Sequence, residues 1–266
     1  MNLPQEKLKT LTTQVIEISL ECGAFLRQES SQFDYSKVEL KGKNDLVSYV
    51  DKQSEQMMVA GLKAILPEAG FLTEEGTIET DSNPLRWIID PLDGTTNFVH
   101  GLPIFSTSIA LMQDDELLIG VVYEVNKDEC FSAYKNGGAY LNGKQITVSK
   151  INSLSESLVA TGFPYNNFEG MEKYLNILKY LMQNAHGVRR LGSAAVDLAY
   201  VAIGRFEGFF EYNLNAWDVA AGALIVKEAG GKVSTFSGGD DYVFGKEIIA
   251  SNEIHTAMKQ VIEKYW

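Results

Sequence analysis

The pattern of apolar residues changes near residue 149, and this change constrains the fold more than any other feature of the sequence. Between residues 86 and 148, short apolar runs are separated by turn residues such as Asn136-Gly137-Gly138, a pattern typical of antiparallel hairpins. After about Ser149, apolar runs of strand type alternate with amphipathic segments, as in a layered α/β unit. The sequence therefore predicts a mixed α+β fold, with N-terminal helices and an antiparallel sheet in residues 1–148 and an α/β subdomain in residues 149–266.

Spacing of apolar residues by three and four predicts the helices of this fold. The first helix has an apolar stripe made of Leu8, Leu11, Val15, Ile18, Cys22 and Phe25. Further helices are predicted over 51–66, 171–185, 193–203, 217–228 and 254–265. Strands are predicted over 86–89, 106–111, 117–125, 130–134, 145–148, 157–161, 188–190, 205–211 and 248–250.

One tight turn carries two acids. A short apolar run ends at Asp90, Pro91 fixes the backbone φ angle, and Gly94 permits a sharp turn that also holds Asp93. Carboxylates held so close repel and raise each other's pKa unless a cation lies between them. Oxygen ligands suit hard cations such as Mg²⁺, and the carbonyl oxygen of Leu92 could add a further ligand. The turn is therefore a candidate metal site.

Acids elsewhere have two possible roles. Glu74 and Glu75 follow a short apolar run, and Asp218 lies at the start of a helix rich in small residues. Taken singly, the glutamates fit a solvated loop, and Asp218 and Asp51 fit helix N-caps, where aspartate is favoured. Glu74 and Asp218 could instead converge with the turn on one metal site. Residue spacing leaves both interpretations open.

Charge and cysteine usage exclude several classes of function. The formal net charge is −12, which opposes direct binding to nucleic acid or to an anionic membrane surface. No apolar run approaches the roughly 20 residues that cross a bilayer, and the N-terminal residues do not resemble a signal peptide, so a cytoplasmic protein is expected. Cys22 and Cys130 lack the arginine six positions later that a cysteine phosphatase needs, since Gln28 and Asn136 occupy those positions. Because the chain is acidic, an anionic substrate would require bound cations to reverse the negative electrostatic potential at its binding site.

Two long motifs resemble those of the inositol monophosphatase family. Trp87 to Asn97 fits the pattern W-x-x-D-P-[ILVA]-D-G-T-x-N, and Trp217 to Gly222 fits W-D-x-A-[AG]-[AG]. Thr73-Glu74-Glu75 keeps both acids of the family's G-E-E motif and replaces its glycine. The similarity covers nearly the whole chain. It implies a five-layered α/β/α/β/α sandwich of the sugar phosphatase type, often as a homodimer, with two or three Mg²⁺ ions and common inhibition by lithium.

The same resemblance implies a role for individual residues. The metal ligands would be the side chains of Glu74, Asp90, Asp93 and Asp218 and the carbonyl of Leu92. Glu74 and Thr95 would position and activate the attacking water, and Asp51 would support Thr95 as well as, or instead of, capping a helix. The substrate would contact Asp93, Gly94, Thr95, Gly192, Ser193, Ala194, Glu211 and Asp218, with Glu211 facing its hydroxyl groups. Lys41 or Lys43 would approach the phosphate. Most metal ligands thus fall in residues 1–148, and Asp218 and most substrate contacts fall in residues 149–266, the two parts forming one catalytic unit.

The leading hypothesis is Mg²⁺-dependent hydrolysis of inositol monophosphate, or of a similar small polyol phosphate, by in-line attack of a metal-activated water. The same chemistry could act on the 2′-phosphate of NADP, on fructose 1,6-bisphosphate or on a 3′-phosphoadenosine nucleotide. A hypothesis of another class is a regulatory binding protein that associates with the transcription machinery.

Overall fold

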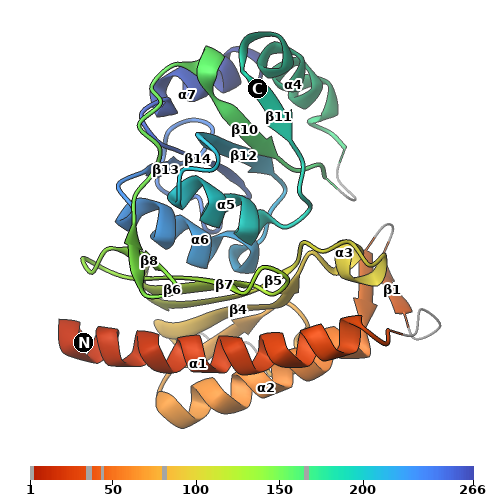
Figure 1. The fold of residues 1–266 in the computed structure, drawn as a ribbon, viewed down its shortest axis with the longest axis vertical. Coiled ribbons are helices and arrows are strands. Elements are labelled where there is room, and N and C mark those ends of the chain that lie inside the picture. The colour runs from red at the N-terminus through yellow and green to blue at the C-terminus, as the bar shows by residue number, and fades with distance from the viewer. Residues whose placement is uncertain (1–2, 34–37, 43–44, 80–82, 165–167) are drawn as a thin grey trace.

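Two β-sheets alternate with three layers of helices in the computed structural model (Figure 1). The structure describes residues 3–33, 38–42, 45–79, 83–164 and 168–266. α1 (Gln5–Ser30) and α2 (Tyr49–Ile65) cover the outer face of a seven-stranded sheet. α5 (Ala194–Ala202) and α6 (Ala216–Glu228) lie between the two sheets, and α4 (Met171–Asn184) and α7 (His255–Tyr265) cover the outer face of a five-stranded sheet. The five layers predicted from the sequence are therefore confirmed.

The seven-stranded sheet has the strand order β3-β4-β5-β6-β7-β8-β9. Its strands are β3 Gly70–Thr73, β4 Leu85–Asp93, β5 Ser106–Gln113, β6 Glu116–Glu124, β7 Glu129–Tyr134, β8 Ala139–Leu141 and β9 Lys144–Ile146. All neighbours pair antiparallel except β3 and β4, which are parallel. The antiparallel pairing predicted for the strands from residue 86 onward is confirmed, and β3 with its parallel pairing was not predicted.

The five-stranded sheet has the strand order β11-β10-β12-β14-β13. Its strands are β10 Leu158–Thr161, β11 Gly187–Arg189, β12 Gly208–Tyr212, β13 Lys232–Ser234 and β14 Glu247–Ser251. β10 pairs parallel with β11 and β12, and β14 pairs antiparallel with β12 and β13. The division of the chain into two parts near residue 149 stays a prediction.

Shorter elements complete the described chain. They are the hairpin strands β1 Val38–Gly42 and β2 Asp45–Ser48, the helix α3 Thr95–Val99 and the 3₁₀ turn Leu154–Glu156. Lys43 and the side chain of Lys41 lie outside the described residues, so the structure does not place the lysines predicted to approach the phosphate. None of the helices built from described residues is long and apolar enough to cross a membrane.

Apolar side chains fill the spaces between the layers. The apolar stripe of α1 packs onto the first sheet, with Leu8, Leu11 and Val15 buried. Met58 of α2 belongs to the same buried cluster. The apolar faces of α5 and α6 pack between the sheets, and Ala221 backbone atoms of α6 lie so close to Gly120 of β6 that a side chain there would meet the carbonyl oxygen at 2.6 Å. These contacts fix the distance between the sheets, and with it the distance between acids that come from the two halves of the chain.

The two predicted N-caps are wrong by three residues. α2 begins after Ser48, and α6 begins after Asn215, so Asp51 and Asp218 are each the third residue of their helix. Asp51 accepts the backbone N–H of Ser48 at 2.8 Å, and Asp218 accepts that of Asn215 at 2.6 Å. An acid at this position satisfies the N–H of the preceding cap residue. The sequence thus placed both acids at helix starts correctly and misassigned their position within the turn.

Candidate active site

The turn that carries Asp90 and Asp93 interrupts the pairing of β4 with β5. Both acids are buried, and the register between the strands shifts between them. Gly94 follows with φ 94°, and a side chain on it would meet the carbonyl oxygen of Ile104 at 3.1 Å and that of Gly192 at 3.2 Å. Only glycine fits both the left-handed backbone and this close approach. The tight turn inferred from the sequence is therefore present, and it is wedged against a loop of the second half.

Three acids converge at this turn. Carboxylate oxygens of Asp90, Asp93 and Asp218 lie within 4.8 Å of one another. Burial raises the pKa of Asp90 well above its usual range, and the charges of Glu74, Asp93 and Asp218 raise it further, as does a side-chain hydrogen bond with Glu74. Burial and then the charge of Asp93 raise the pKa of Asp218 to about 7. Two carboxyls can share a hydrogen bond only through a proton, so the cluster needs either protons or a cation to be stable.

The donor set suits a hard divalent cation. Asp90, Asp93 and Asp218 offer carboxylate oxygens in one group, and Glu74, which is outside that group, lines the same cavity, as does Leu92. Buried carboxylates that raise one another's pKa are the arrangement that a divalent cation relieves, because it replaces repulsion by attraction. The residues that the sequence singled out as possible metal ligands thus lie together in the structure.

Asp93 is held at the start of α5. Its Oδ2 accepts hydrogen bonds from Ser193 Oγ at 2.5 Å and from the backbone N–H of Ala195 at 2.8 Å. Ser193 is also the N-cap of α5, since its Oγ accepts the N–H of Val196 at 3.3 Å, so the predicted helix start at Ser193 is one residue early. Burial raises the pKa of Asp93, whereas these hydrogen bonds and the charge of Arg190 lower it. Burial has the larger effect, so the pKa stays above its usual value.

Thr95 connects the turn to Asp51 on α2. Thr95 Oγ1 lies 3.1 Å from Asp51 Oδ1 and 3.0 Å from the carbonyl oxygen of Leu92. A hydroxyl has one proton to donate, so it hydrogen-bonds as donor to one of these acceptors at a time. The other oxygen of Asp51 accepts from the backbone and hydroxyl of Ser48, at 2.8 and 2.7 Å. The two roles considered for Asp51 are therefore compatible, because each uses a different oxygen.

A cavity of about 340 Å³ opens beside these residues. The remaining residues predicted to contact substrate line it: Gly192, Ser193, Ala194 and Glu211. Burial raises the pKa of Glu211 well above its usual range, the charges of Asp218 and Asp93 raise it further, and the charge of Arg190 opposes them. Glu211 also fits closely against Gly162, where a side chain would meet its carboxyl oxygens at 2.0 Å. Asp51 does not line the cavity and reaches it through Thr95.

Sequence reasoning missed four further residues of this site. Arg190, Asp197 and Lys246 line the cavity, and Asn97 lies behind the turn. Asp197 is buried on α5, its Oδ1 has no hydrogen-bond partner among the described residues, and burial raises its pKa well above the usual range. The sequence feature that could have identified Asp197 is its position four residues after Ser193, which places both residues on one face of a helix.

Asn97 joins the two halves of the site. Its Nδ2 donates to the carbonyl oxygens of Ile104 and Leu191, each at 2.8 Å. The loop before α5 is thereby tied to the segment that follows the acidic turn. No local pattern in the sequence indicates this contact, because Asn97 and Leu191 are 94 residues apart.

The five-layered fold is of the sugar phosphatase type, and its cavity contains a cluster of acids. Comparison with known proteins agrees. A family model described as the inositol monophosphatase family matches residues 7–266. Inositol-1-monophosphatase from Mesorhizobium japonicum is 40% identical over 252 residues, which are 94% of this chain and 95% of that protein. Nus factor SuhB from Escherichia coli K12 is 40% identical over 238 residues, 89% of each chain.

Solved structures show the same similarity. Extragenic suppressor protein suhB from Bartonella henselae superposes with a TM-score of 0.90 at 39% identity, covering 96% of this chain and 99% of that one. An IMPase from Thermotoga maritima superposes with a TM-score of 0.84 at 38% identity, covering 94% and 95%. The chain belongs to the inositol monophosphatase family, a metal-dependent family, and is a phosphoric monoester hydrolase.

Proposed function

We propose that this enzyme uses Mg²⁺ to hydrolyse inositol monophosphate or a similar small polyol phosphate. The observation that carries the proposal is the convergence of Asp90, Asp93 and Asp218 within 4.8 Å in a cavity that also contains the buried carboxyl of Glu211. A cluster of acids gives a place for divalent cations and, through them, for a phosphate. A carboxyl across the same cavity gives a partner for substrate hydroxyl groups.

Two or three Mg²⁺ ions would be held by Glu74, Asp90, Asp93, Asp218 and the carbonyl oxygen of Leu92. When bound, they supply positive charge to the phosphate oxygens and make a water molecule more acidic. The acids compensate one another poorly on their own, as the raised pKa values of Asp90 and Asp218 indicate. The same cations would allow a chain of net charge −12 to accept an anionic substrate.

The chain itself orients the reactants. Thr95 and Glu74 are proposed to hold the attacking water, with Asp51 accepting the hydroxyl proton of Thr95 and so directing the oxygen lone pairs of Thr95 toward the cavity. Gly94 and the loop Gly192-Ser193-Ala194 bring backbone close to the substrate, as their positions in the cavity wall allow. Positioning of this kind is most of what phosphoryl transfer to water requires.

A substrate panel tests the proposal and separates the alternatives. The panel contains inositol 1-phosphate, NADP, fructose 1,6-bisphosphate and 3′-phosphoadenosine 5′-phosphate, each with Mg²⁺ and with or without lithium. We expect the highest kcat/KM on the inositol phosphate, and inhibition by lithium. If one of the other three is preferred, the chemistry stands and the substrate assignment is wrong. If no phosphate is released from any of them, the proposed function is wrong.

A regulatory role is a second candidate, and the names of relatives favour it. Several relatives about as similar as the phosphatases are called Nus factor SuhB. We propose Asp93→Asn as the discriminating variant, because it removes a candidate ligand charge and nearly preserves shape. A cellular phenotype that survives this variant while turnover is abolished favours regulation, and a phenotype that is lost with turnover favours catalysis.

From the family resemblance, we propose that the protein is a homodimer and that it is cytoplasmic. Light scattering on the purified chain tests the dimer, with twice the mass of 29.5 kDa as the expected result. Fractionation of cells tests the location.

A further inference from the structure

One face of α2 contacts three separate segments of the candidate metal site. Asp51, Ser54 and Glu55 are spaced by three and four positions, which places them on the same face of the helix, and all are buried. Asp51 reaches Thr95, and Ser54 Oγ donates to the carbonyl oxygen of Pro91 at 3.1 Å, inside the acidic turn. Glu55 reaches the third segment, which carries Glu74. No role in the proposed chemistry accounts for this last contact.

Glu55 is fully buried and accepts four hydrogen bonds from the residues on either side of Glu74. Its Oε1 accepts from Thr73 Oγ1 at 3.0 Å and from Thr77 N and Oγ1, each at 2.7 Å. Its Oε2 accepts from the backbone N–H of Glu75 at 2.7 Å. The backbone N–H of Glu74 itself donates to the carbonyl oxygen of Ile89 on β4 at 3.3 Å. The main chain of Glu74 is thus fixed from both sides.

We propose that Glu55 is the positioning residue for Glu74 and thereby for the metal site. Residues 74–79, which follow β3, form no helix or strand, so hydrogen bonds from outside the segment, including these four, help to hold its shape. Glu55 holds it at the wall of the cavity, where Glu74 and Asp90 both lie and where the charge of Glu74 contributes to the raised pKa of Asp90. Groups behind a metal ligand that restrict its orientation contribute to metal affinity without touching the metal. The inference rests on the proposed metal site and adds a residue to it.

Glu55→Gln is the variant that isolates this role. Glutamine has nearly the same shape, but one of its terminal atoms is an NH₂ group, which cannot accept a hydrogen bond. In either orientation of the amide, at least one N–H donor of Glu75 or Thr77 then faces another donor. The change therefore disturbs the segment around Glu74 and leaves the charge of Glu74 in place.

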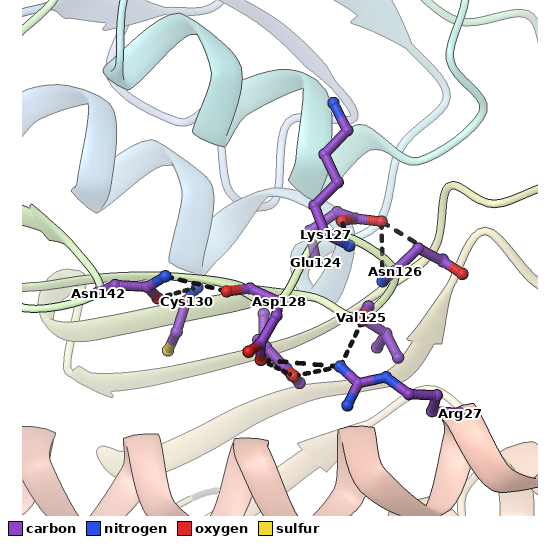
Figure 2. Close-up of polar contacts among 9 residues, drawn as sticks. Arg27, Glu124, Val125, Asn126, Lys127, Asp128, Cys130 and Asn142 are labelled. Atoms are coloured by element: carbon purple, nitrogen blue, oxygen red, sulfur yellow. Dashed lines mark hydrogen bonds and ion pairs between the residues drawn. The ribbon is translucent and has the colours of Figure 1, made fainter.

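Glu124, the last residue of β6, provides a matched control (Figure 2). It is also a buried glutamate that holds a turn, accepting from the backbone N–H of Lys127 at 2.6 Å and of Asn126 at 3.3 Å. It does not line the cavity, and the turn that it holds carries none of the proposed metal ligands. Glu124→Gln should therefore cost stability as Glu55→Gln does, with no effect on metal binding.

The measurement is direct calorimetric titration of the purified full chain with Mg²⁺ in the absence of substrate. We expect Glu55→Gln to weaken binding roughly tenfold, toward the lower end of the loss typical for groups behind a metal ligand, and Glu124→Gln to leave it unchanged. Amide hydrogen exchange, measured without metal, should speed up at Glu75 and Thr77 in the first variant and at Asn126 and Lys127 in the second. Thr77→Val, which removes one donor, is the milder variant should Glu55→Gln fail to fold.

A double-mutant cycle then tests whether Glu55 acts through Glu74. In a Glu74→Gln background the ligand charge is already lost, so adding Glu55→Gln should weaken Mg²⁺ binding by less than about twofold. An equal loss in both backgrounds, or unchanged binding in Glu55→Gln alone, would overturn the inference. Failure of wild-type chain to bind Mg²⁺ at all would instead refute the proposed function, so the two failures are distinguishable.

Discussion

The acids on the two sides of the cavity are held in different ways. Asp93, on the side of the acidic turn, accepts hydrogen bonds from Ser193 and Ala195 that counteract part of the effect of burial on its pKa. Burial raises the pKa of Glu211, on β12 of the second sheet, and of Asp197, further along α5, well above the usual range, and only the charge of Arg190 lowers it. On the first side, Asp93 is thus held by groups of the protein before any ligand binds. The second side retains carboxyls whose hydrogen-bonding capacity is left for a ligand to use.

The largest loss of activity is expected on the side of the acidic turn. Asp90→Asn removes one charge from the cluster while keeping its shape, so kcat/KM at limiting Mg²⁺ should fall by at least about 100-fold. Asp114→Asn is the control, because Asp114 is exposed at the far end of β5 and asparagine tolerates its φ of 53°. Near-wild-type activity of Asp90→Asn would contradict the expectation that the acidic turn contributes more to activity than the other side of the cavity does.

A smaller and selective effect is expected on the other side. Glu211→Gln should lower kcat/KM for polyol phosphates by about tenfold or more, because it alters the buried carboxyl that is proposed to face the substrate hydroxyls. An aryl phosphate without hydroxyl groups is the internal control and should lose less than about threefold with the same variant, since its phosphate uses the other side of the cavity. Equal losses on both substrates would show that Glu211 acts on the metal cluster instead.

The stability of the metal-free protein should fall as pH rises. A carboxyl whose pKa is raised on folding binds its proton more tightly in the native state, so its contribution is favourable at low pH and is lost as pH rises through the folded value. For Asp218 that value is about 7. Metal-free protein should therefore have a melting temperature at least about 2 °C higher at about pH 5.5 than at about pH 8.

Saturating Mg²⁺ should reverse this trend, because the cation binds the deprotonated cluster more tightly. Asp197→Asn should remove part of the slope in metal-free protein, since the pKa of Asp197 is also raised by burial. A flat profile for the metal-free chain would show that the cluster is already neutralised by groups within the protein.

The smallest effect is expected far from the cavity. Arg27 on α1 donates to Tyr123 Oη at 2.7 Å and to the carbonyl oxygen of Val125 at 2.6 Å, so it fastens α1 to the turn after β6 (Figure 2). Arg27→Met keeps most of the apolar stem and should lower the free energy of unfolding by about 1 kcal/mol. Activity at saturating Mg²⁺ should not change. A loss of activity would mean that the packing of α1 is coupled to the site.

Most helices and strands could be predicted from the sequence because each depends on local periodicity, whereas the five layers became an expectation only through the family resemblance. The stripe from Leu8 to Phe25 and the alternation of strands and helices after Ser149 are visible without any knowledge of distant contacts. Strand β3 and its parallel pairing with β4 were not predicted, because four residues carry too little periodicity and pairing direction depends on the connection.

The site was predictable in part for the same reason. Asp90 and Asp93 lie on one turn, so their proximity follows from local geometry, whereas the approach of Asp218 depends on the packing of α6 against the first sheet and became an expectation only through the family resemblance. Glu55, Asp197 and Asn97 were missed. Glu55 and Asn97 act through partners elsewhere in the sequence, Asp197 owes its raised pKa to burial, and each residue type is common in surface helices or turns when considered alone.

The most direct test of the account is a crystal soaked with Mn²⁺, which scatters anomalously and takes the same oxygen ligands as Mg²⁺. If these acids form the metal site, anomalous peaks should lie within bonding distance of carboxylate oxygens of Asp90, Asp93 and Asp218, with Glu74 completing the site. Peaks elsewhere, with these four acids still unligated at saturating metal, would contradict it.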